Sequence, residues 1–391
     1  MDSMKKLLYL VHRLPYPPNK GDKISSNNML NYFSGRWRVH IGTFIDDPED
    51  WQFAEIVRDK CEDSCIVNLP RSKRLTGSIV GMLTNESLSL SYYASRELQD
   101  WVRASVEREC PDAVLVFSGV MGRFVRDLLP PAVPVVFDAE DVDSEKWRSY
   151  GQSKPWPLSW LYRREADKLL AYERDMARRT DVSIFVSQEE ADLFKSLAPE
   201  SADKAHFRTQ GVDSAFFDPG LEFANPYQPG QKVLVFTGAM DYWPNVEAVS
   251  WFCANVLPGL REKVPELLFC IVGMKPVDEV RKLDKLPGVR VTGGVPDVRP
   301  YLAHALAACL PLQLARGIQN KALEAMAMEL PVLATPDALV GIIRYPGVRF
   351  HIATDADDMT AAAVDILSQA RQLNAAGRDC VLEHYNWDTN L

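Results

Sequence analysis

Short apolar runs alternate with helix-length amphipathic stretches along almost the whole chain. This alternation predicts parallel sheets in doubly wound α/β units, because a parallel strand needs a crossover, usually a helix, before the next strand begins. The runs with the length and composition of buried strands are Leu7–Val11, Val39–Phe44, Cys65–Leu69, Ala113–Phe117, Val133–Phe137, Val182–Val186, Val233–Thr237, Leu268–Val272, Val289–Thr292, Ala308–Leu312, Pro331–Ala334 and Phe350–Ile352.

The alternation restarts after a stretch rich in proline and glycine. Residues 214–231 lack apolar periodicity, as interdomain linkers do. A chain of 391 residues is also longer than a domain with a single hydrophobic core usually is. We therefore predict two Rossmann-like domains, residues 1–213 and 232–375, that face each other across a cleft. Ligands should then bind in the loops that follow the carboxyl ends of the strands.

Composition and short motifs exclude several classes of protein. A net charge of −9 argues against a nucleic-acid binder that works by phosphate neutralisation. No apolar run is long enough to cross a membrane, and Leu7–Val11 is too short for a signal peptide, so we expect a cytoplasmic protein. Neither a GxGxxG fingerprint nor a P-loop is present, and no CxxC pair suggests a zinc site.

The strongest functional signal is a loop, a helix and a buried strand near the C-terminus. The helix should open at Asn320, which puts Lys321 and Glu324 near an N-terminus where free N–H groups and the helix dipole favour an anion. Glu324 can accept two ribose hydroxyls while Lys321 faces phosphates. Alternatively, Glu324 is only an acidic residue that the helix dipole favours in the first turn. Because Lys321 and the flanking loop and strand accompany Glu324, we predict a nucleotide-sugar site.

Three glycines occupy positions where a ligand could approach backbone closely. Gly21 ends a proline-stiffened loop before a helix that we expect to start near Ile24, while Gly238 and Gly273 each end a predicted strand. An ordinary surface loop is the alternative at Gly21, and ordinary strand-to-helix turns are the alternative at Gly273 and at the turn containing Val295.

Acidic residues crowd the end of the fifth predicted strand, where five occur within residues 138–145. The carboxylates repel one another, and proteins tolerate such repulsion on a solvated turn or at a functional site. Asp138 and Asp141 are the candidates for contact with a ligand. A helix start is equally compatible, with Asp143 or Ser144 as the N-cap.

Two basic segments lie beside apolar ones. Arg71, Lys73 and Arg74 precede an apolar run at 75–83, and Trp-bearing residues 156–161 precede Arg163 and Arg164. This arrangement suits peripheral docking on an anionic bilayer. It also suits ordinary amphipathic helices that cover the first sheet.

Several of these motifs together resemble the retaining GT-B glycosyltransferases of family 4, and in particular the PEP-CTERM/exosortase-associated sugar transferases of bacterial exopolysaccharide clusters. The segments that carry the resemblance are 14–23, 137–147, 236–242 and 316–328. The resemblance implies transfer of a sugar from a nucleoside diphosphate to a glycan or polyprenyl-linked acceptor, with retention. It also implies a final helix, residues 376–391, that starts a crossover to the first domain.

The resemblance implies a role for each candidate residue. The implied donor-binding residues are Gly21, Gly238, Gly273, Val295, Arg316, Asn320, Lys321 and Glu324. The implied acceptor-binding residues are Asp22 and Lys23, and the implied catalytic residues are Asp138, Asp141, Lys321 and Glu324. No metal or other cofactor is implied, because fixed cations can replace Mg²⁺.

The chain also departs from the family pattern. The His expected near Asp138 is absent, and Arg316 stands where the family has the first of two glutamates. Ala239 replaces an arginine that grips phosphate, which shifts that role to Lys321 and Arg316. Two alternative functions therefore stay open: a non-catalytic GT-B binding or scaffold protein, and a GT-B nucleotide-sugar epimerase or phosphorylase.

Overall fold

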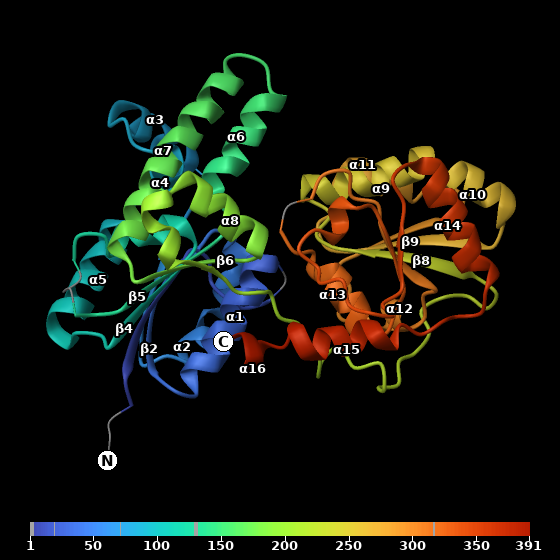
Figure 1. Ribbon diagram of the computed structural model, residues 1–391, viewed down its shortest axis with the longest axis horizontal. Coiled ribbons are helices and arrows are strands. Elements are labelled where there is room, and N and C mark those ends of the chain that lie inside the picture. The colour runs from blue at the N-terminus through green and yellow to red at the C-terminus, as the bar shows by residue number, and fades with distance from the viewer. Residues whose placement is uncertain (1–3, 19, 71, 129–131, 316) are drawn as a thin grey trace. The chain divides into compact units, whose positions relative to one another are not determined.

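A computed structural model describes residues 4–18, 20–70, 72–128, 132–315 and 317–391 (Figure 1). The chain forms two compact units that divide between Arg208 and Thr209. Each unit has its own parallel sheet and its own core. Within the described residues, no helix has both the length and the hydropathy needed to cross a bilayer.

The first unit contains a parallel sheet that has seven strands in its described part, in the order β3-β2-β1-β4-β5-β6-β7. The strands are β1 (Lys6–Val11), β2 (Arg38–Ile45), β3 (Asp63–Asn68), β4 (Ala113–Phe117), β5 (Val135–Glu140), β6 (Val182–Phe185) and β7 (Ala205–Phe207). The α-helices are α1 (Gly21–Ser34), α2 (Ala54–Arg58), α3 (Lys73–Leu83), α4 (Leu88–Tyr92), α5 (Arg96–Glu109), α6 (Asp143–Ser153), α7 (Leu158–Arg179) and α8 (Gln188–Leu197).

Strand β1 shows why this sheet is covered on both faces. All six of its residues are buried, and their side chains alternate between two cores. Leu8 and Leu10 belong to one core, whereas Tyr9 and Val11 belong to the other.

The second unit repeats this plan with six strands among its described residues, in the order β10-β9-β8-β11-β12-β13. The strands are β8 (Lys232–Thr237), β9 (Leu267–Val272), β10 (Val289–Gly293), β11 (Ala307–Leu310), β12 (Val332–Ala334) and β13 (Phe350–Ile352). The α-helices are α9 (Trp243–Asn255), α10 (Leu257–Lys263), α11 (Asp278–Leu283), α12 (Arg299–Ala303), α13 (Asn320–Ala327), α14 (Ala356–Ser368), α15 (Ala375–His384) and α16 (Trp387–Asn390).

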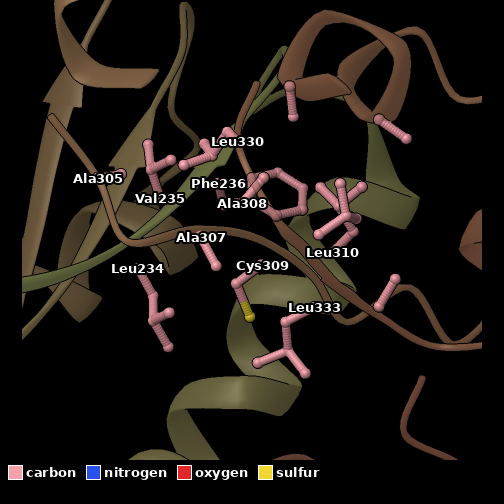
Figure 2. Close-up of a cluster of buried hydrophobic side chains, with 14 of the residues drawn as sticks. Leu234, Val235, Phe236, Ala305, Ala307, Ala308, Cys309, Leu310, Leu330 and Leu333 are labelled. Atoms are coloured by element: carbon pink, nitrogen blue, oxygen red, sulfur yellow. The ribbon is translucent and has the colours of Figure 1, made fainter. Parts of the chain in front are cut away.

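The core of the second unit is built around the neighbouring strands β8 and β11. Figure 2 shows side chains of these strands, among them Leu234, Phe236 and Cys309, gathered with Leu333 of β12. In both units the first three strands run outward to one edge, and the fourth strand then returns to the other side of the first, as in Rossmann-like sheets. The predicted pair of doubly wound α/β domains is confirmed.

Each of the twelve predicted runs contains a strand, but three local predictions are wrong. Helix α1 begins at Gly21, not near Ile24. Strand β5 extends to Glu140, so the acidic run begins inside the strand. The N-cap of α6 is Val142, which has no capping side chain. Carboxylates of other helices accept these hydrogen bonds instead: Glu190 of α8 from the N–H of Val142, and Glu173 of α7 from the N–H of Ser144.

Candidate functional site

Two glycine turns meet at the carboxyl edge of the second sheet. Gly238 follows β8, Gly273 follows the neighbouring strand β9, and Gly238 has a φ of +153°. A Cβ atom on Gly273 would lie 1.7 Å from the carbonyl oxygen of Gly238. Glycine therefore lets the two turns pack backbone against backbone. The structure brings together these two predicted donor residues.

Lys321 lies against this pair of turns. Its Nζ donates a hydrogen bond to Oδ1 of Asn245 at 2.5 Å, and it stands 4.6 Å from the ring centroid of Phe236. It is also 3.3 Å from the position that a Cβ of Gly238 would occupy. Asn245, near the start of α9, is itself fixed by donating to the carbonyl of Ala239 at 2.9 Å. A cation is thus held at the end of β8, where a phosphate could approach backbone.

Glu324 lies on the next turn of the same helix. Its carboxylate receives no hydrogen bond from the described residues. Burial raises the pKa of Glu324 to about 7, and the charge of Lys321 works against this rise. Burial lowers the pKa of Lys321 to about 8, and Glu324 opposes that change. Both groups can therefore change charge near neutral pH.

The N-terminus of α13 has unused hydrogen-bonding capacity. Its N-cap, Gln319, makes no side-chain capping bond, and the first backbone bond runs from the N–H of Ala322 to the carbonyl of Gln319 at 2.9 Å. The side-chain oxygen of Asn320 is buried without a partner among the described residues. The free N–H groups at this helix start can receive an anion, whereas the Asn320 oxygen can only accept a hydrogen bond, for example from a hydroxyl. Arg316 lies outside the described residues.

Val295 lies beyond β10, past Gly293, whose φ is +70°. Its side chain is half-buried and packs against the core of the second unit. Contact of its backbone with a nucleobase stays a prediction.

In the first unit, the predicted acceptor residues lie in the first turn of α1 and already have partners. Asp22 accepts from Arg13 at 2.8 Å and lies 3.1 Å from Nε2 of His12. Although burial alone would raise it, these two neighbours hold the pKa of Asp22 well below its usual range. Lys23 is buried and donates to Asp50 at 2.7 Å. Gly21, the predicted donor-binding residue directly before them, is exposed.

The acidic run at the end of β5 separates into different environments. Asp138 is 1% exposed and accepts from Arg208 at 2.9 Å, and Arg208 also donates to Ser25 at 3.2 Å. Glu140 has a φ of +63°, a strained conformation for a residue other than glycine. Burial, followed by the charge of Asp138, raises the pKa of Glu140 well above its usual range. Asp141 is half-buried, and its N–H donates to the carbonyl of Ala139.

Sequence reasoning did not assign roles to Asn245, Phe236, Arg208 or Glu140. Asn245 and Phe236 are far from Lys321 in sequence, so no local pattern joins them to it. Arg208 follows strand β7, which was not predicted. A prediction of β7 would have placed Arg208 at the carboxyl end of a strand, where ligands bind in such sheets. Within the described part of the chain, no three His, Cys, Asp or Glu side chains come together as a metal site.

Comparison with known proteins finds one family match, which lies within the second unit. Residues 231–369 match the family model described as "Glycosyl transferases group 1". These residues include both glycine turns, Lys321 and Glu324. No curated protein matches the chain significantly in sequence.

Solved structures resemble the chain over nearly its full length at low identity. HepE from Anabaena, solved with UDP and glucose, has a TM-score of 0.66 and 14% identity over 99% of this chain and 97% of its own. Sucrose-phosphate synthase from Thermosynechococcus elongatus has a TM-score of 0.70 and 16% identity over 98% and 96%. WaaG, a glycosyltransferase involved in lipopolysaccharide biosynthesis, has a TM-score of 0.64 and 16% identity over 97% and 95%. The chain has the GT-B fold, and residues 231–369 of its second unit are similar to group 1 glycosyl transferases.

Proposed function

We propose that the protein is a glycosyltransferase that moves a sugar from a nucleoside diphosphate to a glycan or polyprenyl-linked acceptor, with retention at the anomeric carbon. The observation that carries this proposal is the placement of Lys321 against the Gly238 turn, with Glu324 one turn further along α13. The match of residues 231–369 to group 1 transferases supports it. So does HepE, a structural neighbour that was solved with UDP and glucose.

In the proposed reaction, the bond between the sugar and the diphosphate breaks, and its electron pair stays on the leaving diphosphate, which gains negative charge. The acceptor hydroxyl forms the new bond to the anomeric carbon and gives its proton to the departing diphosphate. The ammonium of Lys321 and the N–H groups at the start of α13 would stabilise that charge, and such fixed electrostatics is usually the largest catalytic contribution. Glu324 would accept the ribose hydroxyls. Asp138 and Asp141 are the acids proposed to contact the sugar, and Asp138 also accepts a hydrogen bond from Arg208.

The proposed reaction needs no metal ion or other cofactor, because Lys321 and the helix N-terminus would supply the positive charge that Mg²⁺ supplies in other enzymes. Turnover should therefore be unchanged in EDTA. A large loss that added Mg²⁺ restores would contradict this part of the proposal.

The proposed setting is bacterial exopolysaccharide synthesis, in the PEP-CTERM/exosortase-associated subgroup. The resemblance of segments 14–23 and 137–147 to that subgroup supports it. The protein would then act at the cytoplasmic side of the membrane, where nucleotide-sugars are available.

A thermal-shift screen with UDP, GDP, ADP and dTDP tests the donor site. A diphosphate at a hundred times its Kd should stabilise the protein by about 2.7 kcal/mol, which raises Tm by a few degrees. Glu324→Gln should lose the shift, whereas Glu262→Gln, the same change on the exposed surface of α10, should keep it.

Product analysis then separates the three functions. Transfer predicts that free nucleoside diphosphate is released when an acceptor is present, with the anomeric configuration of the donor kept in the product. An epimerase would change the sugar without an acceptor. Binding of a diphosphate with no turnover on any acceptor would favour the scaffold function.

A further inference from the structure

One face of the first unit carries large apolar side chains in solvent. They come from α3, from the turn that joins α6 to α7, and from the first turn of α7. We call these residues the apolar patch; with their exposed fractions they are Ile79 (53%), Val80 (50%), Met82 (41%), Leu83 (81%), Trp156 (81%), Leu158 (43%) and Trp160 (52%). Scattered exposed apolar residues are ordinary, but a group of this size on neighbouring elements marks an interaction surface.

The packing of α3 explains why its bulky residues point outward. Its inner face is formed by Gly77 and Gly81, which lie against α4. A Cβ on Gly77 would be 3.0 Å from the Cα of Tyr92, and one on Gly81 would be 2.9 Å from the hydroxyl oxygen of Ser91. Because the glycine face takes the contact with α4, the larger apolar side chains are left on the opposite face.

Hydrogen bonds show that the two parts of the apolar patch adjoin. Arg164 of α7 donates to the carbonyl of Gly81 at 3.0 Å and to that of Glu86 at 3.1 Å, on either side of the end of α3. Trp160 lies four residues before Arg164, about 6 Å along the helix axis. In Figure 1, α6 and α7 form a hairpin that projects beyond the sheet, with α3 beside α7.

Basic residues predominate in the two chain segments that carry the apolar patch. Residues 70–84 and 154–164 contain six lysines and arginines in total (Arg71, Lys73, Arg74, Lys154, Arg163 and Arg164) and no aspartate or glutamate, in a chain whose net charge is −9. Lys154 and Arg163 are exposed. A surface that is both apolar and basic is complementary to an anionic apolar partner.

We propose that the apolar patch docks the protein on an anionic lipid bilayer. Trp156 and Trp160 would lie at the level of the headgroups, which tryptophan favours, and Leu83 would enter the acyl boundary. The exposed Lys154 and Arg163 would face the anionic lipids and add to the attraction. This inference goes beyond the proposed transferase function and holds whether or not that function is correct.

Sedimentation with vesicles tests the proposal. The full-length protein should bind vesicles that contain phosphatidylglycerol at least about tenfold more tightly than pure phosphatidylcholine vesicles, and added salt should weaken the binding. The double variant Leu83→Ser/Trp156→Ser should bind at least about tenfold more weakly. Trp51→Ser/Leu373→Ser, the same change at exposed positions outside the apolar patch, should bind like the wild type.

A second measurement keeps the test decisive if a variant fails to fold. Brominated lipids in the vesicles should quench the tryptophan fluorescence of the wild-type protein, and Trp160→Phe should reduce the quenching without loss of Tm. Equal binding to neutral vesicles, or equal loss in both double variants, would overturn the proposal. So would light scattering that shows a dimer which Leu83→Ser/Trp156→Ser dissolves, because the apolar patch would then be a protein interface. UDP binding should be the same in all these variants, which separates this test from that of the donor site.

Discussion

At the scale of single residues, Gly273 is the position where the site tolerates least change. Replacing it with alanine would put a Cβ 1.7 Å from the carbonyl oxygen of Gly238, so one of the two turns would have to move. We expect Gly273→Ala to destabilise the second unit by about 3 kcal/mol and to weaken diphosphate binding. Thermal unfolding with and without UDP measures both effects.

Gly259→Ala is the matched control for this variant. Gly259 lies in α10, and a Cβ there would meet nothing within 4 Å. Alanine should be neutral at this position or should stabilise the protein by up to about 1 kcal/mol. Equal Tm values for the two variants would show that the contact between the glycine turns is unimportant.

The Lys321–Glu324 pair should make donor affinity depend on pH in two directions. Lys321 has a pKa of about 8, so it loses its charge as the pH rises through 8 and the diphosphate should bind more weakly above it. Glu324 has a pKa of about 7, so below pH 7 it becomes protonated and can no longer accept both ribose hydroxyls. Calorimetric titration with UDP should find the tightest binding between pH 7 and 8.

The variant Glu324→Gln isolates the acidic side of this profile. Glu324→Gln should remove the part of the pH dependence of UDP affinity that is due to residue 324, and Glu262→Gln should keep it. The ionisation of the phosphate itself affects both variants equally.

The stability of the free protein should follow the same pKa values. The raised pKa of Glu324 means that stability is lost as the pH rises from about 4.5 to 7, and the lowered pKa of Lys321 means that stability is gained from about 8 to 10.5.

At the scale of elements, α7 organises the helices beside the first sheet through buried glutamates. Glu165 accepts from the N–H groups of Leu88 and Ser89 at 2.7 and 2.9 Å and so caps α4 from outside. Glu173, two helical turns further, accepts from the N–H of Ser144 at 3.1 Å at the start of α6. Glu173 replaces the N-cap side chain that α6 lacks, and Glu165 adds to the cap that Ser87 gives α4. Together they fix α4 and α6 to α7.

Glu165→Gln should therefore destabilise the first unit by about 2 kcal/mol. The amide has one acceptor oxygen instead of two and presents a donor to N–H groups that are themselves donors. The measurement is the urea midpoint compared with that of Asp167→Asn, an exposed position on the same helix that should change stability by less than about 0.5 kcal/mol. Equal midpoints would mean that α4 is held by its apolar contacts alone.

The elements that could be predicted from the sequence are those with a strong local pattern. The buried strands are apolar runs, and the opening of α13 at Asn320 follows from local residues. Strand β7 was missed because it is three residues long at the edge of the sheet, with only Ala205 buried. The contact of Lys321 with Asn245 joins residues 76 apart in the chain. Such pairs depend on how the strands are ordered, which short patterns do not specify.

At the scale of the whole molecule, the two proposals assign one ligand to each compact unit. The second unit carries the glycine turns and the cation for a nucleoside diphosphate, whereas the first carries the apolar patch for an anionic bilayer. The two ligands differ in chemistry, and each would reduce local opening of the backbone where it binds. Their effects should therefore be separable along the sequence.

Hydrogen–deuterium exchange on the intact protein measures this separation. UDP should slow exchange in residues 238–245 and 317–324, because it would occupy the free N–H groups and fix both turns. Vesicles with phosphatidylglycerol should slow exchange in residues 73–83 and 154–163 instead. Glu324→Gln should remove the first effect and leave the second, and Leu83→Ser/Trp156→Ser should do the reverse. If UDP slowed exchange only in the first unit, the donor site proposed at Lys321 would be wrong, because a ligand stabilises most strongly the segment that it contacts.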